Sequence, residues 1–170
     1  NQLLQRAKSE EEILSQTAFQ LMKLLNRSLI VYPEQNGGLG AEQIFSVDGE
    51  TAQNIFSAPE ERDAANWTFA NKKRSGAGTD SYPDAKGLYL ALRTGGGVFG
   101  VVGIDLSEKP LDAFENSVLL SILGEGALAI ENRRNALEKE QATVQAKNEE
   151  LRANLLRTIS HDLRTPLTSI

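Results

Sequence analysis

Hydrophobic residues near the N-terminus of the chain recur with a helical period. Between residues 1 and 27 the apolar positions are spaced by three, four and seven, at Leu4, Ala7, Leu14, Ala18, Leu21 and Leu25. This spacing predicts an amphipathic helix whose narrow stripe suits pairing with another helix. Residues 29–32 then predict a short strand that stops at Pro33, and residues 43–47 predict a second strand.

The middle of the chain predicts two helices and a hairpin. Residues 51–56 fit a short helix, and Pro59 followed by Glu60 and Glu61 suits the first turn of another, which we expect to end near Asn71. Residues 72–84 indicate a loop. Two segments rich in β-branched and aromatic residues, 87–93 and 98–106, flank three consecutive glycines and predict a β-hairpin. A further helical region opens at Pro110.

From residue 131 onward, charged and polar residues dominate and the apolar residues follow a heptad. The seam positions are Leu137, Gln141, Val144, Asn148, Leu151 and Leu155. Polar residues at such positions set register and partner number at a cost in stability. We expect residues 131–160 to form a parallel dimeric coiled coil, with a solvated single helix as the alternative.

The order of these elements predicts an α+β fold. We expect an antiparallel sheet flanked by helices, with the first and last helices on one face. The long N- and C-terminal helices would meet those of a second copy in a parallel dimeric helical bundle or coiled coil.

Composition narrows the function classes. The net charge of −5 argues against a nucleic-acid partner, which usually needs a basic face. No run of 18 apolar residues occurs, so we expect no direct membrane insertion by this chain. The chain has no cysteine and one histidine, which excludes disulfides and leaves no ligand set for a His-rich or thiolate metal site. We therefore expect no metal and a cytoplasmic location.

The single histidine stands in the string Ser-His-Asp-Leu-Arg-Thr-Pro-Leu of residues 160–167. A largely neutral imidazole can accept a phosphoryl group on nitrogen, and an adjacent acid can orient the ring and raise its nucleophilicity. Asp162 is placed to be that acid beside His161. Thr165 lies four residues after His161 and shares its helical face. Pro166 predicts a bend just beyond the site. The plainer interpretation is a lone surface histidine near a helix end.

This string resembles the phosphoacceptor motif, or H-box, of sensor histidine kinases. Residues 67–72 (Trp-Thr-Phe-Ala-Asn-Lys), residues 77–80 (Ala-Gly-Thr-Asp) and residues 151–159 are similar to the KdpD family of membrane-bound potassium and turgor sensor kinases. The resemblance implies an N-terminal helix over 1–27, a GAF sensor domain over 28–131, a signalling coiled coil over 132–157 and the start of the phosphoacceptor helix over 158–170.

The same resemblance implies the chemistry and the partners. His161 would be phosphorylated by a catalytic domain of the same protein that binds ATP and Mg²⁺, with Asp162 assisting and Thr165 linked to phosphatase activity. The phosphoryl group would pass to a KdpE-type response regulator, in a homodimer at the cytoplasmic face of a bacterial inner membrane. The chain shows no glycine-rich phosphate loop, so we expect it to be inactive alone and to hold no cofactor itself.

The ligand of the sensor domain stays open at this point. Without cysteine a bilin has no thioether attachment, and the Asn71-Lys72 pair lacks the Asp-Glu dipeptide of cyclic-nucleotide-binding relatives. The loop cations and glycines are a candidate anion site, with a solvated loop as the alternative: Lys72, Lys73, Arg74, Gly76 and Gly78. The expected function is a regulatory module that relays a signal of potassium limitation or osmotic stress to His161. The alternatives are a small-molecule- or anion-binding module and a structural dimerisation spacer.

Overall fold

The computed structural model describes residues 2–168, with side chains described for residues 4–5 and 8–164. It consists of two units, Asn1–Asn132 and Arg133–Ile170, which we treat separately. The elements, in chain order, are α1 (Gln2–Leu25), β1 (Leu29–Gln35), β2 (Gly38–Leu39), β3 (Gln43–Phe45), α2 (Gly49–Phe56), α3 (Pro59–Asn71), β4 (Ser75–Gly76), β5 (Gly87–Thr94), β6 (Gly97–Asp105) and α4 (Ala113–Thr168).

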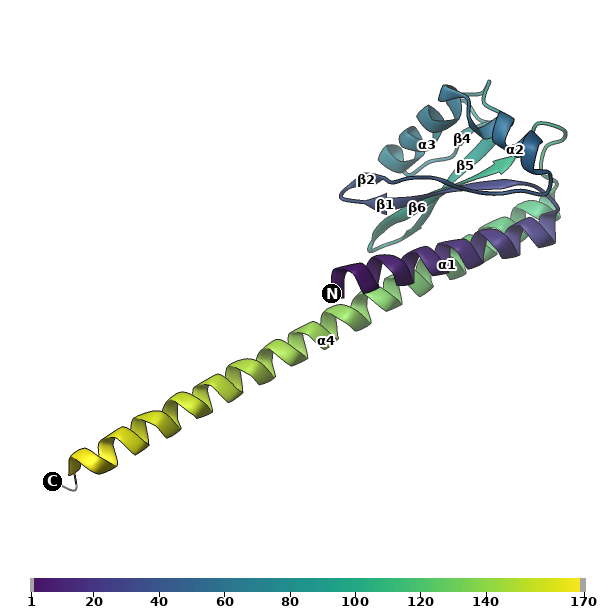
Figure 1. Ribbon diagram of the computed structural model, residues 1–170. Coiled ribbons are helices and arrows are strands. Elements are labelled where there is room, and N and C mark those ends of the chain that lie inside the picture. The colour runs from purple at the N-terminus through teal and green to yellow at the C-terminus, as the bar shows by residue number, and fades with distance from the viewer. Residues whose placement is uncertain (1, 169–170) are drawn as a thin grey trace. The chain divides into compact units, whose positions relative to one another are not determined.

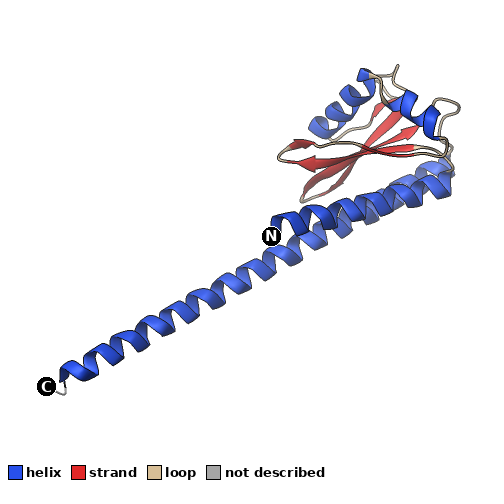
Figure 2. Ribbon diagram, in the orientation of Figure 1, coloured by secondary structure: helices blue, strands red, loops and turns tan. Residues whose placement is uncertain are grey.

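An antiparallel sheet forms the centre of the first unit (Figure 2). Its strand order is β2-β1-β6-β5-β4, and β3 pairs with β1 as well. The expected hairpin of β5 and β6 is present, paired from Gly87 with Asp105 to Thr94 with Gly97. Gly97 takes a φ of 142° at the turn, a conformation that favours glycine. The predicted α+β architecture is therefore confirmed.

Helix α1 and the first part of α4 cover one face of this sheet (Figure 1). Their apolar side chains form the larger core with Val102 and Leu90; Leu21, Leu119 and Ile130 are fully buried in it. The first and last helices thus share a face, as the sequence predicts. Between Ala113 and Arg164, α4 is long and apolar enough to span a membrane by length and composition alone. The first part of α4 contributes Leu119, Leu123 and Ile130 to this core.

The opposite face of the sheet is covered by α2 and α3 (Figure 1). The core there includes Phe56, Ala65, Tyr32 and Tyr89, all buried. A Cβ at position 103 would collide with the Tyr89 ring, so Gly103 gives this ring its place on the sheet.

Three local features differ from the sequence-based expectation. Strand β1 does not stop at Pro33 but continues to Gln35, with Pro33 opposite Gly100 of β6. On the side of β1 away from β6, the neighbouring strand is interrupted between β2 and β3, so position 33 needs no N–H donor there. The Pro33 carbonyl accepts a hydrogen bond from the Gly40 N–H at 2.7 Å. The strand expected over residues 43–47 is β3, which ends earlier, at Phe45. The expected loop over residues 72–84 contains the short strand β4.

The second unit is the remainder of α4. Val144, Leu151 and Leu155 are each about half exposed or more on it. Residues 131–160 are helical, as predicted. Whether this apolar stripe pairs with a second helix in a coiled coil stays a prediction. Helix α4 is assigned through Pro166 to Thr168, and the bend expected at Pro166 also stays a prediction.

Candidate functional site

His161 lies on α4 with its side chain 82% exposed, beside an Asp162 side chain that is 75% exposed. The distance from His161 Nδ1 to Asp162 Oδ1 is 3.8 Å, which is longer than a hydrogen bond. Asp162 Oδ1 therefore lies on the Nδ1 side of the ring. The role of the pair in phosphoryl transfer stays a prediction.

Three further side chains lie on the His161 face of the helix. Asn154, Arg157 and Thr158 line a shallow hollow of about 430 Å³ together with His161. Arg157 Nη2 donates to Asn154 Oδ1, and Thr158 Oγ1 donates to the Asn154 carbonyl at 2.9 Å. The sequence analysis missed these three residues. They precede His161 by three, four and seven positions, and such spacings in a helix place side chains on the same face as the histidine.

Thr165 belongs to α4, but its side chain lies outside the part of the chain whose side chains the structure describes. Its expected link to phosphatase activity therefore stays a prediction.

Several polar groups in the loop of the candidate anion site form hydrogen bonds within the fold. Lys72 ends α3 with a left-handed φ of 58°, and Arg74 Nη2 donates to Asn116 Oδ1 at 2.9 Å. The amides of Gly76 and Ala77 donate to the carbonyls of Ser81 and Gly87 at 2.7 and 2.9 Å. These N–H groups are thus committed within the fold, while Lys72 and Lys73 are exposed. The anion site stays a prediction.

The two aromatic residues that flank Thr68 in α3, Trp67 and Phe69, are only partly buried, and Phe69 packs against the smaller core. Thr68 between them is fully buried, with its Oγ1 2.7 Å from Ser75 Oγ. Ser75 Oγ also donates to the Ala64 carbonyl at 2.7 Å. These hydrogen bonds of Thr68 and Ser75 link α3 to β4.

A buried carboxylate holds the start of α3 to the start of β5. Glu61 is 2% exposed, and its oxygens accept from the amides of Lys86 and Gly87 at 3.0 and 2.9 Å and from the Tyr89 hydroxyl at 2.8 Å. Burial and the neighbouring Glu61 charge raise the pKa of Tyr89 far above its usual range, so the phenol stays a donor. Sequence analysis assigned Glu61 only to the helix dipole.

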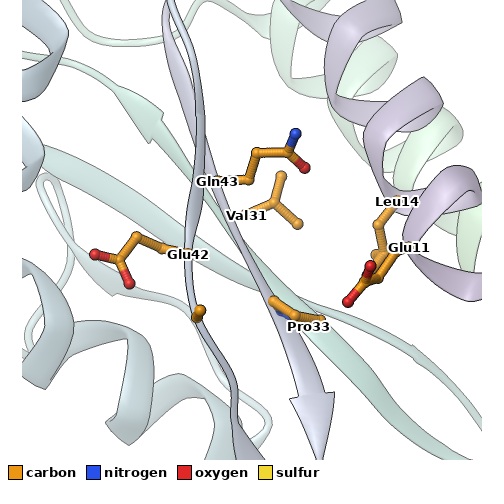
Figure 3. A pocket seen from close by; sticks show the side chains of 7 residues that line it. Glu11, Leu14, Val31, Pro33, Glu42 and Gln43 are labelled. Atoms are coloured by element: carbon orange, nitrogen blue, oxygen red, sulfur yellow. The ribbon is translucent and has the colours of Figure 1, made fainter. Parts of the chain in front are cut away.

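A groove of about 280 Å³ opens between α1 and the interrupted strand beside β1 (Figure 3). Leu14 and Val31 form part of its apolar wall, and the Glu11 carboxylate lies on the α1 side. The Gln43 side chain is held by a hydrogen bond from Ser15 Oγ at 2.9 Å. Glu42 points away from the groove, in keeping with its ion pair to Arg62 at 3.1 Å. Among the described residues, no cluster of three or more histidine, aspartate or glutamate side chains is arranged to hold a metal ion.

Comparison with curated proteins finds relatives along nearly the whole chain. The sensor protein KdpD of Clostridium acetobutylicum is 34% identical over 160 residues, which are 94% of this chain and 18% of that protein. The sensor protein KdpD of Escherichia coli K12 is 32% identical over 144 residues, 84% of this chain and 15% of that protein. The chain thus spans less than a fifth of the length of these relatives. No protein-family model matches it.

Solved structures agree on the fold. The GAF domain of the potassium sensor histidine kinase KdpD from Escherichia coli superposes with a TM-score of 0.51 at 22% identity, covering 84% of this chain and 97% of that one. The PixJ GAF domain of Thermosynechococcus elongatus gives 0.54 at 18% identity, covering 84% and 96%. The chain is therefore a homologue of one segment of the KdpD sensor proteins, and its first unit has the GAF fold.

Proposed function

We propose that this chain is the regulatory segment of a membrane-bound two-component sensor histidine kinase, and that its GAF domain relays a signal to the phosphoacceptor His161. The observation that carries the proposal is an exposed histidine, followed by its acid, in an intact H-box string on α4, a helix that begins in the GAF core. The signal that we assign to it is potassium limitation or osmotic stress; the structural relative from Escherichia coli, a potassium sensor histidine kinase, supports the potassium part.

The chemistry assigned to this segment is that of a phosphoryl acceptor. The His161 imidazole attacks the γ-phosphorus of ATP, which a catalytic domain of the same protein binds with Mg²⁺. Asp162 on the Nδ1 side favours the positive charge that develops on the ring. A KdpE-type response regulator then takes the group onto an aspartate. Val144, Leu151 and Leu155 supply the apolar stripe through which two copies pair.

An ion pair inside the GAF unit supports the relay. The Arg27 guanidinium follows α1 and binds the Glu115 carboxylate in the first turn of α4, with Nε to Oε2 at 3.0 Å. It also binds the carbonyls of Asp105, Lys109 and Pro110, which lead from β6 into α4. A displacement of either the sheet or α1 therefore acts on the start of the helix that carries His161.

The test uses the full-length protein in membrane vesicles with γ-labelled ATP. Wild type should incorporate acid-labile label, and His161→Gln should incorporate none while folding normally, because glutamine keeps a polar side chain but cannot accept the group. Raising potassium in the assay should reduce the label on wild type. Undiminished label on His161→Gln would refute the assignment of the acceptor, and a label indifferent to potassium and osmolyte would refute the assigned signal.

The groove beside Leu14 favours a second candidate function, binding of a small ligand by the GAF unit. A thermal-shift screen of this chain with nucleotides, phosphate and potassium tests it, because a ligand that binds only the folded state raises the melting temperature. Leu14→Phe, which narrows the groove, should abolish any shift that arises there.

A further inference from the structure

The hollow beside His161 contains a cation that the H-box does not include. We propose that Arg157 binds the phosphoryl group once His161 carries it, and so sets the lifetime of the phosphohistidine. This inference rests on the proposed phosphoacceptor function. Its observations are the shared lining of the hollow by Asn154, Arg157, Thr158 and His161 and the hydrogen bond that holds the guanidinium to Asn154.

Helix geometry directs the His161 ring toward Arg157. Residues four apart share a face, and side chains lean toward the helix N-terminus, so His161 leans over the turn that carries Arg157. Asp162 stands on the Nδ1 side of the ring, which assigns the phosphoryl group to Nε2. Arg164 follows His161 by three residues but does not line this hollow.

The product of the transfer needs a cation at this place. As the lone pair of Nε2 forms the N–P bond, the P–O bond to ADP breaks and ADP leaves with the electron pair, while the proton on Nδ1 passes to the Asp162 carboxylate or to water. The attached phosphoryl group then carries about two negative charges at neutral pH. A guanidinium presents a planar fork that pairs with two phosphoryl oxygens at once, and the hold of Asn154 on Arg157 reduces the entropy lost on binding.

The chain itself allows a test without the catalytic domain, because His161 is its only histidine. Phosphoramidate phosphorylates imidazoles: its P–N bond breaks, ammonia leaves, and the new N–P bond forms on the ring. Phosphorus NMR then reports the pKa of the attached phosphoryl group, and the decay of its signal gives the hydrolysis half-life. The variants are Arg157→Ala and Arg157→Lys. The matched control is Arg152→Ala, also an exposed arginine and about 140° around the helix from Arg157.

Arg157→Ala should raise the phosphoryl pKa and shorten the half-life by a factor of about two to five, the range of exposed charge pairs. Arg157→Lys should recover part of both effects, since it keeps the charge and loses the fork. Arg152→Ala should match wild type. Circular dichroism checks that each variant keeps its helix, which alanine at an exposed helical position favours.

Equal pKa and half-life in Arg157→Ala and Arg152→Ala would overturn the role of Arg157. That outcome is separate from a failure of the proposed function, because chemical phosphorylation needs only an accessible imidazole. If Arg157 acts as proposed here but the full-length protein gives no ATP-derived label on His161, the phosphoacceptor assignment fails and the local charge pairing stands.

Discussion

Replacing Arg27 by alanine should destabilise the GAF unit far more than a typical surface substitution. The Arg27 side chain is 6% exposed and the side chain of its partner Glu115 is 13% exposed. The guanidinium makes two bonds to that carboxylate, at 3.0 and 3.3 Å, and three to backbone carbonyls, at 3.0, 2.7 and 3.0 Å. The variant therefore leaves a shielded carboxylate and three acceptors without their donor.

Removing one partner of a buried ion pair costs about 3–5 kcal/mol. Because Glu115 is only partly buried, we expect a smaller cost here, about 2–3 kcal/mol. Urea unfolding of the 170-residue chain, followed by circular dichroism and by the fluorescence of the single tryptophan, measures this cost. Arg62→Ala is the matched control. Arg62 also pairs with a carboxylate and two carbonyls, but its side chain and that of Glu42 are 41% and 46% exposed. That substitution should cost about 1 kcal/mol or less.

The difference between wild type and Arg27→Ala should also depend on pH. The hydrogen bond from Arg27 holds the pKa of Glu115 below its ordinary value of 4.5. A depressed carboxylate pKa contributes stability that is present above the ordinary value and is lost as the pH falls through the folded-state value. The gap between the two proteins should therefore narrow in acid. A gap no larger than that of Arg62→Ala at neutral pH, or one that is independent of pH, would refute the reasoning.

Two further predictions concern the other face of the sheet and the surface of α4. Burial raises the pKa of Tyr32 from 10.0 to about 12. The contribution of Tyr32 to the free energy of unfolding should therefore be fully present below pH 10.0 and be lost as the pH rises toward 12. Urea midpoints across that range check this, and Tyr32→Phe should reduce the fall and leave the part that comes from Tyr89. Gly103→Ala should cost about 1–3 kcal/mol, because its Cβ collides with Tyr89. A Cβ added at Gly124 of α4 meets no atom within 4 Å, so Gly124→Ala should instead raise the free energy of unfolding by about 0.5–1 kcal/mol. Equal melting temperatures for Gly103→Ala and Gly124→Ala would contradict both expectations.

Elements whose burial follows a simple period could be predicted from the sequence. Helix α1 and the β5–β6 hairpin lie close to their expected ranges, because their buried faces repeat every three to four residues or every second residue. Pro33 misled the prediction, since a proline is tolerated where the neighbouring strand is interrupted, and that interruption is a property of the folded sheet. β4 has only two residues and carries no periodic signal.

Contacts between distant residues could not be predicted in the same way. Arg27 and Glu115 are 88 positions apart, and Glu61 and Tyr89 are 28 apart, so neither pair leaves a local pattern. At the candidate site, His161 and Asp162 were identified because a contiguous string carries them. Arg157 lies outside that string, and only its helical spacing from His161 indicates that the two share a face.

The bonds of Glu61 also affect how the segment between α3 and β5 can vary. This segment follows Ser75–Gly76, which pairs with β5, and ends at Lys86 and Gly87, whose amides Glu61 holds. Between these ends Ser81 accepts from the Gly76 amide, and Ala85 is buried in the smaller core. Both ends are therefore fixed independently of the exposed residues between them, such as Tyr82 and Asp84. Because the entropic cost of closing a loop grows only slowly with its length, we expect insertions among the exposed residues 82–84 to leave the core intact. The domain thus has a place where a reporter or a new recognition loop can be added.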